Sequence, residues 1–178
     1  MTNLFSSGAP ASEGIRLIAE NGMPGTAFAD LDGKPGVHEV IATSVPVHPK
    51  GGLGSSKLTT EITGVPGEYL SLPVMLICTN DGFVGLDSVK LPRGNETAVY
   101  FPKAYDAGTE LNDELGTSIV GACAVIGPVP IPGGGTNDRT ATSSNIEAHS
   151  GIEGIADLDV KAHNWRNKIA RVTVKRVN

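Results

Sequence analysis

The sequence predicts a single all-β domain, on the evidence of its turn residues, its alternating apolar positions and its length. The 178 residues include 23 glycines and 12 prolines, while only 4% are aromatic. This composition favours short strands joined by many turns over long helices. Apolar side chains alternate most clearly over residues 70–78, as in a strand with one buried face. The length suits one core of ordinary size, so we expect a single domain over residues 1–178.

One short helix is expected near the N-terminus, and it is the only helix that the sequence predicts. Ser12 can cap its first turn, because a serine oxygen accepts a hydrogen bond from a free backbone N–H there. Ile15 and Ile18 give the segment an apolar side. Gly22 then provides a stop, since glycine adopts the left-handed conformation that ends many helices.

The strands are expected between turns that glycine and proline mark along the rest of the chain. The strongest candidate should turn one face to the core, with Leu70, Leu72, Val74, Leu76 and Cys78 on that face. The final strand should bury Val172 and Val174, and it should expose the residues that alternate with them, Arg171, Thr173 and Lys175. We expect strands near residues 37–43, 70–78, 83–91, 96–101, 117–126 and 169–177. Residues 128–144, rich in proline, glycine and small polar residues, predict an exposed, mobile loop.

Charge and hydropathy exclude two classes of partner. The formal net charge is −5 and 19% of the residues are charged, so no basic surface is available for nucleic acid or for an anionic membrane. No apolar run has the length of a membrane span, and the N-terminus lacks the pattern of a signal peptide. If the protein is exported, either a leader has been removed or this start lies inside a longer precursor.

Three carboxylates predict a calcium site. Asp106 and Glu110 lie four residues apart across an Ala-Gly turn, and Asp81 lies at the end of a predicted strand. Carboxylate oxygens on a turning backbone are the ligands that Ca²⁺ prefers. The alternative is a solvated turn, because Asp and Gly favour turns for backbone reasons alone. Asp113 and Glu114 either add charge around the ion or form a solvated acidic run.

Other chemistries find little support in the sequence. The histidines, His38, His48, His149 and His163, show no short zinc-ligand spacing, and neither cysteine stands in a C-x-x-C motif. No G-x-S-x-G or comparable nucleophile motif is present, so we expect no enzymatic activity. Cys78 and Cys123 can form a disulfide or remain two buried thiols, and the sequence leaves both open.

Three motifs together resemble the spondin N-terminal domain family, in particular its bacterial members. They match in order and spacing, and the resemblance covers most of the chain. Asp106 and Glu110 match the acids of the family's Asp-Ala-Gly-Thr-Asp motif, with Glu in place of the second Asp. Asp81 matches the acid of its Ser-Pro-Asp-Trp motif, although Gly82 stands where animal members have tryptophan. The motifs are Thr79–Asp87, Ala104–Glu110 and Ile169–Val174.

This resemblance implies an antiparallel, eight-stranded, C2-like β-sandwich of the cell exterior or periplasm. It further implies a secreted adhesion or interaction module that binds Ca²⁺ through Asp81, Asp106 and Glu110. The family's first strand, which precedes Leu4 and Phe5, has no counterpart here. Three explanations stay open: a longer natural protein, a different local pairing, or a strand donated by another chain. We therefore expect a protein partner or a second copy at an open sheet edge, and as an alternative function a subunit of an extracellular polymer or coat.

Overall fold

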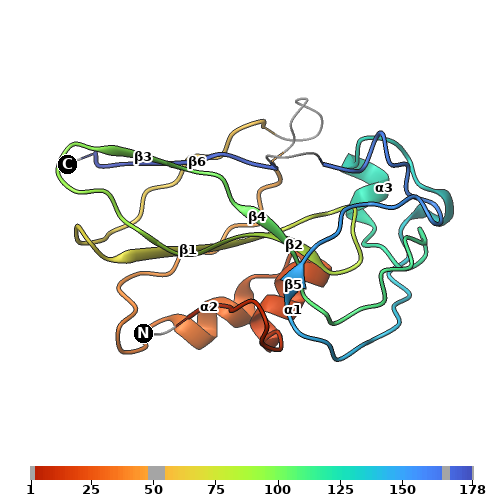
Figure 1. The fold of residues 1–178 in the computed structure, drawn as a ribbon, viewed down its shortest axis with the longest axis horizontal. Helices are drawn as coiled ribbons and strands as arrows, with labels where there is room; N and C mark the ends of the chain where they lie inside the picture. The colour runs from red at the N-terminus through yellow and green to blue at the C-terminus, as the bar shows by residue number, and fades with distance from the viewer. Residues whose placement is uncertain (1–2, 48–54, 166–168, 178) are drawn as a thin grey trace.

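The computed structural model describes residues 3–47, 55–165 and 169–177 of the chain, and it combines helices with two small sheets. Figure 1 shows the elements along the chain. The helices are α1 (Glu13–Asn21), α2 (Gly25–Leu31), α3 (Ala122–Ile126) and the 3₁₀ turn η1 (Pro132–Gly134). The strands are β1 (Tyr69–Met75), β2 (Gly82–Lys90), β3 (Thr97–Tyr100), β4 (Lys103–Asp106), β5 (Glu147–Ala148) and β6 (Val172–Lys175).

The prediction of an all-β, eight-stranded, C2-like sandwich is wrong. Within the described residues, an antiparallel sheet of four strands has the order β1-β2-β4-β5, and β3 pairs with β6 in a separate sheet of two. The only strand that the described chain contains between β4 and β6 is β5, which has two residues. Loops fill this part of the molecule, and they satisfy their polar groups through turns and side chains instead of strand ladders.

Helix α1 forms where the sequence predicts it, and α2 is a helix that the sequence analysis missed. The Ser12 hydroxyl accepts a hydrogen bond from the Ile15 N–H, and Gly22 ends the helix with φ 66°. In α2, Ala27 packs so closely on α1 that a Cβ at Gly14 would lie 2.8 Å from its Cα. The second helix therefore depends on a tertiary contact, which local propensity does not reveal.

The strands near residues 70–78, 83–91, 96–101 and 169–177 are confirmed as β1, β2, β3 and β6, but the predicted buried face of β1 is not. The pairing of β1 with β2 shifts register between Leu70 and Leu72, which marks a β-bulge. A bulge changes which side chains share a face, so Leu70 no longer alternates in step with Leu72. Val74, predicted to be buried, is exposed, although it lies on the same side of the bulge as the half-buried Leu72.

Two further predicted strands are absent from the structure. Residues 37–43 form no strand. The apolar run 117–126 passes through a turn, where Ile119 is buried, and ends in helix α3, where Cys123 is buried. An apolar run of this length is ambiguous by periodicity alone. Residues 128–144, predicted to be an exposed loop, contain η1 and the largely buried Arg139.

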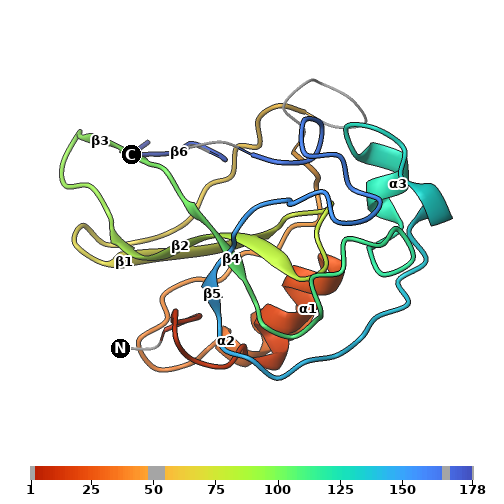
Figure 2. The ribbon, with the colours of Figure 1, turned by 45° about the vertical axis from the view of Figure 1, so that its right-hand side comes forward.

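The two small sheets and the helices occupy separate sides of the molecule. Helices α1 and α2 lie along one face of the four-stranded sheet, and β3 with β6 lies on the opposite side (Figures 1 and 2). Helix α3 and its neighbouring loops extend beyond one end of that sheet (Figure 1). None of the helices in the described part of the chain has the length and apolar character that a membrane crossing requires.

Two apolar cores correspond to this arrangement. The first lies between α1 and the four-stranded sheet, where the Phe83 ring is fully buried against Phe5 and Tyr105. The second lies between α3 and the loops and contains a disulfide between Cys78 and Cys123, whose Cα atoms are 5.0 Å apart. The structure thus decides for the disulfide, and disulfides persist in oxidising compartments. The second core comprises Ile119, Cys123, Ile131, Ile152 and Leu158.

Candidate functional site

A tight turn before β2 places Asp81 at the loop end of the sheet. The Thr79 hydroxyl donates to the Leu76 carbonyl (2.6 Å) and accepts from the Gly82 N–H (2.9 Å). A Cβ at Gly82 would lie 2.5 Å from the Thr79 hydroxyl oxygen and 3.0 Å from a ring carbon of His149. A side chain at residue 82 is therefore excluded by space.

Asp81 is a buried carboxylate with one free oxygen. Its side chain is 0% exposed. Its Oδ2 atom accepts hydrogen bonds from the backbone N–H of Thr109 (2.7 Å) and Glu110 (3.0 Å) and from the Thr109 hydroxyl (3.2 Å). Its Oδ1 atom has no hydrogen-bond partner among the described residues, and no described basic side chain forms an ion pair with it. Such a carboxylate needs a proton or a cation to balance its charge.

The backbones of Asp81 and Asp106 are neighbours because β2 and β4 pair in antiparallel register. Gly82 is opposite Asp106 in this pairing, and the Ala107 N–H donates to the Asp81 carbonyl (3.1 Å). The Asp106 carboxylate accepts from the Gly108 N–H (2.7 Å) and from the Asn112 side chain. Gly108 has φ 69° and a Cβ there would lie 2.6 Å from the Asn145 carbonyl oxygen, so this turn requires glycine.

Glu110 points into a different set of contacts. Its Oε1 atom lies 2.9 Å from Nε of Arg139, while its Oε2 atom is buried without a hydrogen-bond partner in the described chain. Arg139 also pairs with Glu20 (3.2 Å), which in turn pairs with Arg16 (2.7 Å). A hollow of about 370 Å³ lies among these four charged side chains and Thr109, Ala141 and Thr142. The sequence analysis missed Arg139, because no local pattern links it to residues on α1.

Strand pairing makes Asp81 and Asp106 neighbours along the backbone, whereas the Glu110 carboxylate lies against Arg139. Among the described residues, one group of three His, Cys, Asp or Glu has ligand atoms all within 4.8 Å of one another, and it is Cys78, Cys123 and His163. The three predicted calcium ligands do not form such a group. The burial of Asp81 and its free oxygen suit a cation, whereas Glu110 already has a positive partner.

Asp113 and Glu114 organise loops and are not a solvated acidic run. Asp113 accepts from the side chains of Asn80 (3.0 Å) and Ser118 (2.7 Å). Glu114 is buried, and its carboxylate accepts from three successive backbone N–H groups, at 2.6, 2.7 and 2.9 Å. These donors belong to residues 153–155. Charge-assisted hydrogen bonds of this kind are strong, so Glu114 fixes the loop after β5.

Burial raises the pKa of two acids in this region. For Asp81 the loss of hydration raises the pKa most, and the negative charge of Asp106 adds to it, while the hydrogen bonds from Thr109 and Glu110 oppose it. For Glu110 burial raises the pKa to about 8, against the attraction of Arg139 and with repulsion from Glu20, Asp81 and Asp113. Both carboxyl groups hold protons more tightly in the folded state than in the unfolded chain.

The raised pKa of Glu110 predicts that stability falls as pH rises. Between the ordinary pKa of 4.5 and the folded value of about 8, the folded protein keeps a proton that the unfolded chain releases. The stabilisation is therefore complete below pH 4.5 and lost as the pH passes 8. We expect Glu110→Gln, whose side chain stays neutral at every pH, to flatten the decline. Melting temperatures in chelator, measured across this range, check it.

The two melting curves should converge at low pH, with the Glu110→Gln variant the more stable at the alkaline end. Asp30→Asn, at an exposed position of α2, is a matched control whose pH profile should follow the parent protein. Parallel profiles for the parent and the Glu110→Gln variant would show that Glu110 ionises in the folded state as it does in the unfolded chain.

His149 borders the Asp81 turn but carries no positive charge at neutral pH. Burial lowers its pKa more than Asp106, Glu114 and Glu153 raise it. Its Nδ1 atom accepts from the Gly151 N–H (3.0 Å), and its ring packs edge-on against Trp165 with centroids 4.9 Å apart. His149 thus packs under the turn and leaves the charge on Asp81 uncompensated.

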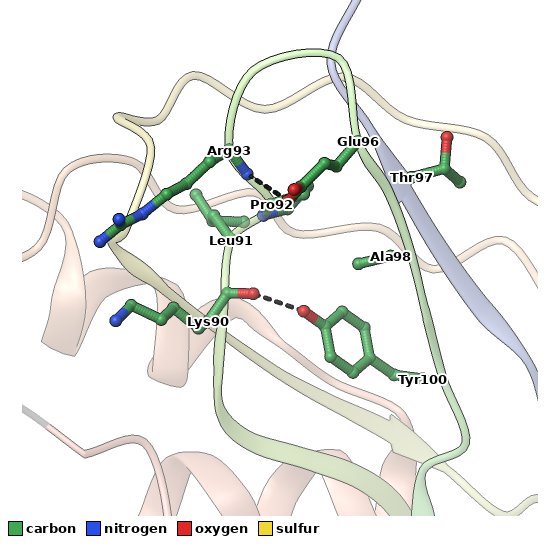
Figure 3. A pocket seen from close by; sticks show the side chains of 8 residues that line it. All are labelled: Lys90, Leu91, Pro92, Arg93, Glu96, Thr97, Ala98 and Tyr100. Atoms are coloured by element: carbon green, nitrogen blue, oxygen red, sulfur yellow. Dashed lines mark hydrogen bonds between the residues drawn. The ribbon is translucent and has the colours of Figure 1, made fainter.

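A second hollow, of about 500 Å³, lies at the opposite end of β2, around the turn to β3. Figure 3 shows that the Glu96 carboxylate accepts from the Arg93 backbone N–H (3.3 Å) and that the Tyr100 hydroxyl donates to the Lys90 carbonyl. The polar groups that line this hollow are therefore hydrogen-bonded to one another across the turn. It contains none of the predicted metal ligands, and we assign it no function.

Comparison of the chain with protein-family models finds no matching family, and comparison with curated proteins finds no relative. The resemblance to spondin N-terminal domains therefore stays a prediction that rests on the quoted motifs.

Proposed function

We propose that this chain is a non-catalytic interaction module of the cell exterior or periplasm whose loop end binds Ca²⁺ through Asp81 and Asp106. The observation that supports it most is the free Oδ1 atom of Asp81, which is buried and has no basic partner among the described residues, while the negative charge of Asp106 raises the pKa of this carboxyl group. A divalent cation at this point would neutralise both charges. The proposal keeps the relationship to bacterial spondin domains that the motifs suggest.

The chemistry of the donors favours calcium over a transition metal. Both proposed ligands are carboxylates, and further oxygen ligands can come from backbone carbonyls and water, as calcium accepts. The two hydrogen bonds on the Asp106 carboxylate leave lone pairs available on its oxygens. Glu110, the third predicted ligand, would have to contribute its Oε2 atom, since Arg139 holds Oε1.

An extracellular setting is supported by the disulfide between Cys78 and Cys123, since such bonds form in oxidising compartments. We assign the module a role in adhesion or assembly through a protein partner. Calcium would act by tying β2, β4 and their loops together. Because the ion binds only the folded form, its binding free energy adds to the stability of the fold.

The outer edge of β1 is the proposed place for a partner or a second copy of the chain. Within the described residues β1 pairs only with β2. The Leu76 N–H points to Gly82 of β2, so by alternation Pro73 falls on the outer side, where it has no N–H to donate. A pairing strand would gain fewer hydrogen bonds there. This favours an interaction module over the alternative, a continuous polymer or coat built by strand donation.

Calcium is expected to raise the melting temperature. An extracellular module with Kd of about 10⁻⁴–10⁻³ M would gain about 1–2 kcal/mol at about 5 mM calcium. For a chain of this size, that corresponds to an increase of about 2–8 °C. The measurement is thermal unfolding with calcium and with chelator, and equal curves in the two conditions would refute the proposal.

Variants assign the effect to named ligands. Asp81→Asn and Asp106→Asn should each abolish the increase, whereas Glu110→Gln should keep most of it because Glu110 pairs with Arg139. Asp32→Asn, on an exposed residue after α2, is the matched control and should respond as the parent protein does. If Glu110→Gln abolishes the increase, the ligand set includes all three predicted acids.

A further inference from the structure

A buried histidine, His163, lies beside the disulfide between Cys78 and Cys123. Cys78 follows β1, Cys123 lies in α3, and His163 belongs to the loop after residue 159. One ligand atom from each of the three lies within 4.8 Å of the others. The cysteines are 45 residues apart in sequence, so the cluster has none of the short spacings by which zinc sites are recognised. The fold, not a local motif, brings them together.

One nitrogen of His163 is held by the backbone and the other is free. The Nδ1 atom accepts a hydrogen bond from the Asp159 N–H (2.9 Å). The Nε2 atom is buried and has no hydrogen-bond partner among the described residues, and His163 as a whole is 8% exposed. A buried ring nitrogen without a partner is uncommon in folded proteins. It is therefore the nitrogen available to a ligand.

The Asp159 backbone suits a metal-bound imidazole as well as a free one. Its carbonyl oxygen lies 3.3 Å from Nδ1 of His163. When a metal binds Nε2, the ring proton moves to Nδ1, and this carbonyl can accept it. Histidine ligands of metals usually donate their second N–H to such a group. Protonation of Nδ1 ends the hydrogen bond from the Asp159 N–H, so the ring has to shift from this N–H toward the carbonyl oxygen.

We propose that the reduced form of this chain binds Zn²⁺ through the sulfurs of Cys78 and Cys123 and Nε2 of His163. The disulfide and the metal are then alternative links across the second core. In a tetrahedral site with Zn–S bonds of about 2.3 Å, ligand atoms lie roughly 3.8 Å apart. One ligand atom of each residue already lies within 4.8 Å of the others, so opening the S–S bond is the largest change required.

Conversion of the disulfide form to the zinc form needs a dithiol reductant. The reductant gives two electrons to the S–S bond and itself becomes a disulfide. Its two protons are transferred to the sulfurs of Cys78 and Cys123, which become thiols. Zn²⁺ then forms two Zn–S bonds and one Zn–N bond, and both thiol protons pass to solvent. Three protein ligands leave the fourth position to water. The zinc form belongs to the chain before oxidation or after reduction.

Cobalt provides the test, because Co²⁺ replaces Zn²⁺ and its thiolate complexes absorb in the near ultraviolet and visible. The reduced protein, freed of metal, is titrated with Co²⁺ alone and then with Zn²⁺. We expect one Co²⁺ per chain, displaced by Zn²⁺, and no thiolate band from the oxidised protein. Loss of the ligand in His163→Gln should weaken Co²⁺ binding by more than about 10–100-fold, the usual effect of losing an outer-shell partner.

Two control variants separate this site from the others. His38→Gln removes an exposed histidine that pairs with Glu68, and Asp32→Asn removes an exposed carboxylate that follows α2. Both should bind Co²⁺ as the reduced parent protein does. The proposal is overturned if the reduced protein gives no thiolate band. It is equally overturned if His163→Gln titrates like the parent, which is also the result expected from two thiols on an unfolded chain.

Discussion

Replacing Phe83 by alanine is expected to lower the free energy of unfolding by about 3–5 kcal/mol, the usual cost of removing a buried phenylalanine. The Phe83 ring is 0% exposed. It packs edge-on against Phe5, with centroids 5.1 Å apart, and stacks on Tyr105 at 5.4 Å. The cavity left by alanine would lie where α1 meets the sheet, and helix and sheet cannot both close on it without breaking other contacts.

The position of Phe83 also ties the core to the candidate site. It follows Asp81 by two residues, and its β4 partner Tyr105 precedes Asp106. The Phe83→Ala variant should therefore lose calcium response as well as stability. Urea unfolding measures the loss, with Val125→Ala as a control, because Val125 is 69% exposed on α3. A loss of under about 1 kcal/mol at Phe83 would mean that this core is not packed as described.

Removing the disulfide by the double change Cys78→Ala with Cys123→Ala is expected to cost about 4 kcal/mol, from the loop-entropy estimate for a closed loop of this length. The bond closes 45 residues and lies in a core with Cys123 at 0% exposure. Little else except loop contacts links α3 to the end of β1. The bond therefore restricts the unfolded chain and joins the second core to the sheet.

The same experiment can be done without mutation. Adding a reductant to the parent protein should lower the urea midpoint about as far as the double change does, and Zn²⁺ should then restore part of it in the parent protein only. If neither treatment moves the midpoint, the loops around α3 hold together without a covalent link, and the second core is more stable than its small size indicates.

The elements that the sequence predicts correctly have local signals. Ser12 and Gly22 specify the two ends of α1, and alternation over Val172 and Val174 specifies the faces of β6. Capping and alternation act within a few residues, so one sequence suffices to recognise them. The same holds for the turn at Gly108, whose positive φ explains the Ala-Gly pair after Asp106.

The elements that the sequence analysis missed depend on contacts between distant segments. Helix α2 is short and forms against α1 at Gly14, and the apolar run before Cys123 turns into a helix next to the disulfide. The prediction of an eight-stranded sandwich rests on the resemblance of three short motifs. Two of these motifs contain the predicted site residues, and none extends into residues 111–165, where most of the loops between β4 and β6 lie. The glycine, proline and polar residues of those loops predict turns, but they do not predict how the strands are arranged into sheets.

The candidate site shows the same division. Asp81 and Asp106 become backbone neighbours through the pairing of β2, which the sequence predicts, with β4 (Lys103–Asp106), which it does not predict. The partner of Glu110 is not predicted either, because Arg139 comes from a loop that looks exposed in sequence and pairs with Glu20 of α1. Nor is the role of Glu114, whose three backbone donors lie about 40 residues away.

Isothermal titration of the metal-free, oxidised protein with calcium measures whether the loop end of the sheet binds the ion. The buried, unpaired Oδ1 of Asp81 beside Asp106 predicts one ion per chain, with affinity that weakens as pH falls and the raised pKa of Asp81 brings a proton into competition. Asp81→Asn should show no binding heat. Absence of binding in the parent protein, or equal binding by the Asp81→Asn variant, would contradict the account.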